Sequence, residues 1–217
     1  MSASSRYVLL GAHLLREDAE IEGVTVLPAG GIFLSAIDAP PRSNVAERDL
    51  IAKAARARQE LAAKETFIAI RYGATASSPE EAAVKCAVHL DRWKSLLERR
   101  RGMAELTLKA GSTSRPTRPD RASFTSGAAY LRALREASRG AEADPAFMVA
   151  ARERLGEIAE RVELRRREEG GSELAILIRR SAVSAARNAA EELRKLFPAV
   201  PFLLSGPWPL EVFADDE

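Results

Sequence analysis

The chain has 217 residues, of which 46% are hydrophobic and 29% charged, a composition typical of a folded globular protein. Its 33 basic and 31 acidic side chains give a net charge of +2, so no global positive field attracts nucleic acid or an anionic membrane. No apolar run is long enough to cross a bilayer, no export signal is evident, and the single cysteine cannot form an internal disulfide, so we expect a cytoplasmic protein.

The first hundred residues predict a small α/β domain. An early strand is followed by a hairpin that turns at Gly30-Gly31, where two glycines supply the positive φ angles of a tight turn. Ser78-Pro79-Glu80-Glu81 combines an N-cap serine, a proline in the first turn and a glutamate that can reach back to the cap. The expected elements are strands at 7–11, 23–27, 32–37 and 66–72, and helices at 44–61 and 79–101.

The second half predicts a similar series of elements. Asp144-Pro145 opens a helix, Gly170-Gly171 turns a second hairpin, and Ser181 is placed to cap the last helix. The expected elements are a strand at 103–110, a mobile loop at 111–123, helices at 126–138 and from 144, strands at 162–167 and 173–179, a helix from 181 to 196 and a strand at 200–205.

Both halves contain a hairpin turning at a glycine pair, then a helix, then a strand that ends in Gly73 or Gly206, which indicates an internal duplication. The second half follows the ferredoxin-like βαββαβ order with extra helices. The first half has too few residues at 13–21 for more than a degenerate first helix, so its sheet is a trimmed version. We therefore predict an α+β protein of two lobes: an N-terminal α/β domain at 1–101, including the connecting helix 79–101, and a C-terminal ferredoxin-like domain at 102–217.

The sequence shows no motif for catalysis, metal binding or cofactor binding. His13 and His89 lie far apart, and no nucleophile elbow or phosphate-binding Lys-Ser/Thr pair is present. We expect His89 to be a boundary histidine that packs on Trp93, and Cys86 to be a small buried hydrophobe. His13 has no evident partner. The sequence thus favours a protein that is not an enzyme and holds no cofactor or metal.

Three stretches carry a resemblance to a known family. They are Phe67-Ile68-Ala69-Ile70-Arg71-Tyr72-Gly73, Ser126-Gly127-Ala128-Ala129-Tyr130-Leu131 and Ser205-Gly206-Pro207-Trp208-Pro209, with Glu105 and Lys109 in the strand between the first two. In this order they resemble the GvpL/GvpF family of gas vesicle proteins over nearly the whole chain. The resemblance implies a non-enzymatic accessory protein of gas vesicle assembly that contacts the hydrophobic shell subunit or other gas vesicle proteins, in association with the vesicle, without nucleic-acid or membrane partners.

The partner-binding or family-motif candidates are Arg71, Tyr72, Gly73, Tyr130, Gly206, Pro207, Trp208 and Pro209. We interpret 205–209 as a stiff turn after the last strand, with Trp208 filling the gap between the domains in preference to contacting a partner. Arg71 can pair with a carboxylate such as Glu105 across neighbouring strands. Two alternatives stay open: a small-molecule-binding protein or enzyme that uses the cleft between the lobes, and an RNA-binding sheet.

Overall fold

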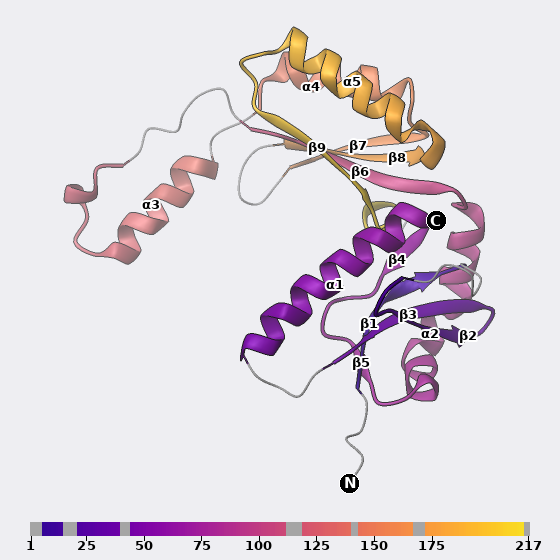
Figure 1. Cartoon of the computed structure of the whole chain (residues 1–217). Helices are drawn as coiled ribbons and strands as arrows, with labels where there is room; N and C mark the ends of the chain where they lie inside the picture. Colours follow the sequence, from indigo (N-terminus) through magenta and orange to yellow (C-terminus); the bar gives the residue numbers. More distant parts are fainter. Residues whose placement is uncertain are drawn as a thin grey trace. The chain divides into compact units, whose positions relative to one another are not determined.

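A computed structural model describes residues 6–14, 21–39, 44–111, 119–139, 143–166 and 172–214 (Figure 1). The chain divides into two compact units, one comprising residues up to Glu105 together with those from Gly206 onward, and the other comprising Leu106–Ser205. We expected the second domain to include everything after residue 101, whereas the segment that follows Ser205 belongs to the first unit. The predicted α+β class is confirmed.

The sheet of the first unit has the strand order β2-β3-β1-β4, with the short β5 also paired to β1. The predicted hairpin turns at Gly30-Gly31, whose φ angles are 56° and 84°. The strand expected at 66–72 ends early, because Arg71-Tyr72-Gly73 turns instead of continuing the ladder. The strands are β1 (Tyr7–His13), β2 (Thr25–Ala29), β3 (Ile32–Asp38), β4 (Phe67–Ala69) and β5 (Thr75–Ala76).

Two long helices, α1 (Asn44–Lys64) and α2 (Pro79–Arg99), bury opposite faces of this sheet. Successive side chains of a strand point to opposite faces, so Val8 and Leu10 join the cluster of α1 while Leu9 joins that of α2. The buried residues of α2 are Ala82, Cys86, Leu96 and Leu97, with Ala83, Leu90 and Trp93 partly buried beside them. The apolar stripe predicted for α2 therefore covers a sheet face.

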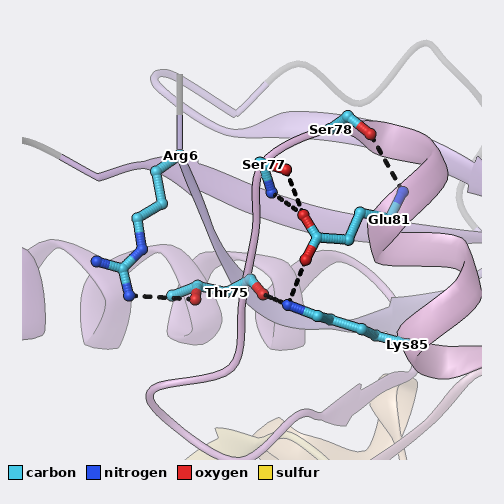
Figure 2. A network of polar contacts seen from close by, with 6 residues as sticks. All are labelled: Arg6, Thr75, Ser77, Ser78, Glu81 and Lys85. Atoms are coloured by element: carbon cyan, nitrogen blue, oxygen red, sulfur yellow. Dashed lines mark hydrogen bonds and ion pairs between the residues drawn. The ribbon is translucent and has the colours of Figure 1, made fainter. Parts of the chain in front are cut away.

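The start of α2 is held by the Ser78 cap that the sequence predicts, but the glutamate expected to reach back to the cap bonds Ser77, one residue earlier (Figure 2). The Glu81 amide donates to Ser78 Oγ at 3.2 Å, while the Glu81 carboxylate accepts from Ser77 N at 2.6 Å. Lys85 Nζ lies 2.6 Å from Glu81 Oε1 and donates to the Thr75 carbonyl at 2.7 Å. The bonds from Lys85 and Ser77 lower the pKa of Glu81 to about 2. The glutamate thus bonds the residue before the cap and, through Lys85, connects α2 to β5.

The sheet of the second unit has the order β7-β8-β6-β9, and α4 and α5 contribute to the core on one of its faces. This order repeats that of the first sheet: the two hairpin strands, then the opening strand, then the closing strand. Residues 15–20, where at most a degenerate helix was expected, lie outside the described residues. The elements are β6 (Met103–Ala110), α3 (Gly127–Arg139), α4 (Pro145–Gly156), β7 (Arg161–Arg166), β8 (Ser172–Arg179), α5 (Val183–Leu196) and β9 (Phe202–Trp208).

The predicted helix starts of the second unit have mixed outcomes. Asp144 caps α4, since Asp144 Oδ1 accepts from the amides of Ala146 and Phe147. The Ser181 cap is wrong: a 3-10 turn, Arg180–Ala182, leads into α5, and no side chain caps that helix. In the loop expected at 111–123, Arg121–Ser123 also forms a 3-10 turn, whereas residues 112–118 and the second hairpin turn at 167–171 lie outside the described residues.

The stretch interpreted as a closing turn is instead part of a strand. Ser205, Gly206, Pro207 and Trp208 all belong to β9, with a cis Gly206-Pro207 peptide bond and a φ of 120° at Gly206. A proline, which lacks an N–H, is tolerated at the edge of a sheet, and β9 is an edge strand. Glycine and proline therefore misled the turn prediction here because the sequence does not show which strand is at the edge.

Candidate functional site

The last three residues of the first family stretch form an exposed turn on the first unit. Arg71, Tyr72 and Gly73 lie between β4 and β5, and Gly73 has a φ of 95°. Arg71 is exposed and Tyr72 is 38% exposed. On both sides the backbone is fixed: Ile70 N donates to Leu10 O at 3.0 Å, and Ala74 N donates to Arg71 O. The side chains of Arg71 and Tyr72 are thus exposed on a turn whose backbone is fixed by hydrogen bonds.

The third family stretch leads the chain back to the same strand. After Pro209, Leu210 forms a parallel bridge with Ile68 of β4, and its amide donates to Phe67 O at 2.7 Å. Leu210 is 2% exposed and Phe213, in the 3-10 turn Val212–Ala214, is fully buried. Trp208, by contrast, is 36% exposed. The C-terminal segment is therefore anchored on the first unit by Leu210 and Phe213.

Glu105 holds this C-terminal segment. Its Oε2 accepts hydrogen bonds from the amides of Glu211 at 3.1 Å and Val212 at 3.0 Å. Burial raises the pKa of this carboxyl, and the backbone hydrogen bonds oppose the rise without cancelling it. The expected pairing of Glu105 with Arg71 is wrong, because the carboxylate is turned to the backbone amides of the returning segment.

Arg58, which the sequence did not single out, makes two partly buried hydrogen bonds in this region. Its Nε donates to Leu10 O at 3.1 Å, and its Nη2 donates to Ile70 O. Burial lowers its pKa, while the charge of Glu211 acts in the opposite direction. The sequence feature that could have identified Arg58 is its position next to Ala57, on the edge of the apolar stripe of α1.

Two open pockets share Arg71 and Trp93 in their linings and have volumes of 390 and 490 Å³. We call them together the Arg71 groove. The 390 Å³ pocket is completed by residues of α1, α2 and the C-terminal segment. The 490 Å³ pocket is completed by the turn before α2 and by the first half of that helix. The side chains that matter below are Arg58, Arg71, Tyr72, Lys85, Cys86, His89, Arg92, Trp93, Leu210 and Glu211.

The groove combines positive charge with an aromatic wall. Trp93 is partly buried and stacks on the exposed His89, with ring centroids 5.1 Å apart and an interplanar angle of 21°. The packing of His89 on Trp93 is therefore confirmed. Cys86 is buried and burial raises the pKa of its thiol, which agrees with a small hydrophobic role. Aromatic and arginine side chains together are typical of protein contact surfaces.

The remaining family candidate, Tyr130, belongs to the second unit. It lies on α3 and packs edge-to-face with Phe124, with centroids 5.9 Å apart, and the guanidinium of Arg121 lies 5.9 Å from its ring centre. The structure thus brings Arg71, Tyr72 and Gly73 together with the segment that follows Pro209, and places Tyr130 in a separate local cluster.

His13, which had no evident partner in the sequence, is a core residue. It ends β1 at 0% exposure, with Nε2 2.6 Å from Ser35 Oγ and its ring centroid 6.1 Å from those of both Phe33 and Phe67. Within the described ranges, no group of three or more histidine, cysteine or carboxylate side chains is placed to hold a metal ion. None of the described helices has both the length and the apolar character of a membrane span.

These features define a two-unit α+β protein that carries Arg71, Tyr72 and Gly73 in one exposed turn. A family model described as gas vesicle synthesis protein GvpL/GvpF matches residues 14–214, and the chain belongs to this family. No curated protein matches the sequence.

Two solved structures have a similar fold. The crystal structure of gas vesicle protein GvpF from Anabaena sp. PCC7120 has a TM-score of 0.65 at 15% identity, covering 99% of this chain and 98% of that one. GvpF from Microcystis aeruginosa has a TM-score of 0.63 at 12% identity, covering 98% and 100%. At this identity the likeness shows a shared fold over the full length of both relatives.

Proposed function

We propose that this protein is a non-enzymatic accessory factor in gas vesicle assembly that binds the hydrophobic shell subunit, other gas vesicle proteins, or both. Family membership supports the gas vesicle role. The observation that supports a binding role is the Arg71-Tyr72-Gly73 turn, exposed on a frame that the returning C-terminal segment completes at β4. A preorganised surface loses little conformational entropy when a partner binds.

We also propose a ferredoxin-like architecture for the two units. Both units are ferredoxin-like variants, the first with a trimmed opening helix, and the repeated strand order β2-β3-β1-β4 and β7-β8-β6-β9 supports this assignment. Gly206, Pro207, Trp208 and Pro209 act mainly by leading the chain from β9 back to the first unit, where Leu210 pairs with β4.

The direct test is co-purification of the tagged full chain with a coexpressed gas vesicle shell subunit. We expect a complex that survives gel filtration at micromolar concentration, and the same chain should retain other gas vesicle proteins coexpressed in place of the subunit. A tagged unrelated α+β protein is the control for capture by hydrophobic surface alone. Repeated failure to recover any gas vesicle protein would overturn the proposal.

A further inference from the structure

We propose that the Arg71 groove binds an acidic segment of a partner protein, with a carboxylate on the Arg71 guanidinium and an adjacent apolar side chain against Trp93. This inference rests on the proposed function for the identity of the partner, and it adds the chemistry by which that partner is recognised. It is carried by the charges that line the groove, by the hydrogen bonds that these charged groups already make, and by the partly buried Trp93 that lines both pockets.

The charge of the groove favours an anionic occupant. Among the described lining residues, the basic side chains are Arg58, Arg71, Lys85 and Arg92, and the acidic side chain is Glu211. Most of these groups already serve the fold. Arg58 donates to two main-chain carbonyls, and Lys85 binds Glu81 and the Thr75 carbonyl. Arg92 donates to Ala214 O at 3.3 Å.

Arg71 differs from these neighbours. It lines both pockets and is exposed, and among the described residues no ion pair or side-chain hydrogen bond engages it. A guanidinium offers five N–H donors in a planar fork that fits a carboxylate in two parallel hydrogen bonds. Because the peptide units on both sides of Arg71 are hydrogen-bonded to the sheet and turn, its backbone is already fixed before a partner binds.

The aromatic wall accounts for the apolar half of the occupant. Trp93 also lines both pockets, so an apolar side chain next to the bound carboxylate can lie on the indole. His89 supports the ring from one side. Tryptophan and arginine are the residue types that most often dominate the binding energy of protein interfaces. An acidic residue beside an apolar one therefore satisfies both parts of the groove.

Size and charge favour a peptide over nucleic acid. Pockets of 390 and 490 Å³ fall in the range of sites that hold a small ligand, enough for a few side chains. Binding of a nucleic-acid strand depends on several phosphate contacts along a basic track. The net charge of this chain is only +2, and among the described groove residues Arg71 is the basic side chain to which no fold contact is assigned. The acidic peptide is therefore the occupant that the groove fits.

Tryptophan fluorescence provides the test. The chain has two tryptophans, so Trp208→Phe leaves Trp93 as the reporter. The probe is a short synthetic peptide of alternating glutamate and leucine, and the comparison peptide carries glutamine in place of glutamate. We expect the glutamate peptide to shift the emission of Trp93 with an affinity that falls as salt rises. Anisotropy of labelled peptide on the unmodified chain repeats the measurement if Trp208→Phe fails to fold.

Charge reversal identifies the binding residue. Arg71→Glu should weaken peptide binding about tenfold or more, and Arg71→Lys should retain part of it, because lysine keeps the charge but loses the bidentate fork. The matched control is Arg56→Glu, an exposed arginine on α1 that lines neither pocket. Equal binding of the glutamine peptide, equal losses in both reversal variants, or tighter binding of single-stranded oligothymidine would each overturn the inference.

The two proposals can fail separately. If the unmodified chain and Arg71→Glu capture the shell subunit equally, and peptide binding is unaffected, the groove inference is wrong while the proposed function stands. If the glutamate peptide binds through Arg71 but no gas vesicle protein is ever captured, the groove inference stands and the proposed function is wrong.

Discussion

Acidification should destabilise this protein through His13. Burial of the imidazole inside the first unit lowers its pKa from 6.5 to about 4. An unfolded chain therefore binds a proton on this histidine at a higher pH than the folded chain does. The stability that depends on neutral His13 is complete above pH 6.5 and is lost as the pH falls from 6.5 to about 4.

The size of this loss follows from the two pKa values. Each pH unit between them changes the free energy of unfolding by about 1.4 kcal/mol, so the whole interval between 6.5 and about 4 corresponds to about 3 kcal/mol. Domains are typically stable by about 5–15 kcal/mol, so the loss is a substantial fraction of the total.

Urea unfolding across this pH range measures the effect. The difference in free energy of unfolding between the unmodified chain and His13→Gln should change by about 3 kcal/mol across that range. The chain has two histidines, so proton NMR can follow each imidazole directly. Parallel stability curves for the unmodified chain and His13→Gln would refute the reasoning, as would an imidazole of His13 that titrates near 6.5.

Substitutions at three further positions test the anchoring and capping contacts by urea unfolding. Phe213→Ala should cost about 3–5 kcal/mol because it empties a fully buried site, whereas Phe213→Leu should cost less than about 1.5 kcal/mol; equal losses would contradict a packing role. Glu105 has a raised pKa, so the unmodified chain should lose stability as the pH rises from 4.5 through the folded value, and Glu105→Gln should lack that loss; unchanged pH dependence would contradict it. Asp144→Ala should cost about 1 kcal/mol through loss of the α4 cap, and Asp144→Asn should recover most of it; an unaffected midpoint in Asp144→Ala would show that the cap is dispensable.

Much of the local structure could be predicted because its causes lie within a few residues. The glycines of the first hairpin, the Ser78 cap and the Asp144 cap each act on neighbouring backbone groups, and all three were placed correctly. The Ser181 cap and the turn at Gly206 failed for a related reason. Whether a serine caps a helix or a proline interrupts a strand depends on neighbours that the local pattern does not show.

The candidate site was predicted in part. The sequence selected Arg71, Tyr72 and Gly73, and the structure places them in one exposed turn. It did not select Arg58, and it gave Arg71 the wrong partner. Both errors have one physical cause. The sequence shows that a side chain is charged, but tertiary packing decides which carbonyls, amides and carboxylates lie within its reach.

The sequence by itself determined the Ser78 and Asp144 caps and the glycines of the first hairpin, together with the motifs that mark the family. Tertiary structure decided that the chain returns to the first unit after β9, with Leu210 beside β4 and Phe213 in the core. The contact from Glu105 to the Val212 amide spans 107 positions. Local propensity acts over a turn or two of chain, whereas such a contact exists only when the folded first unit brings its two ends together.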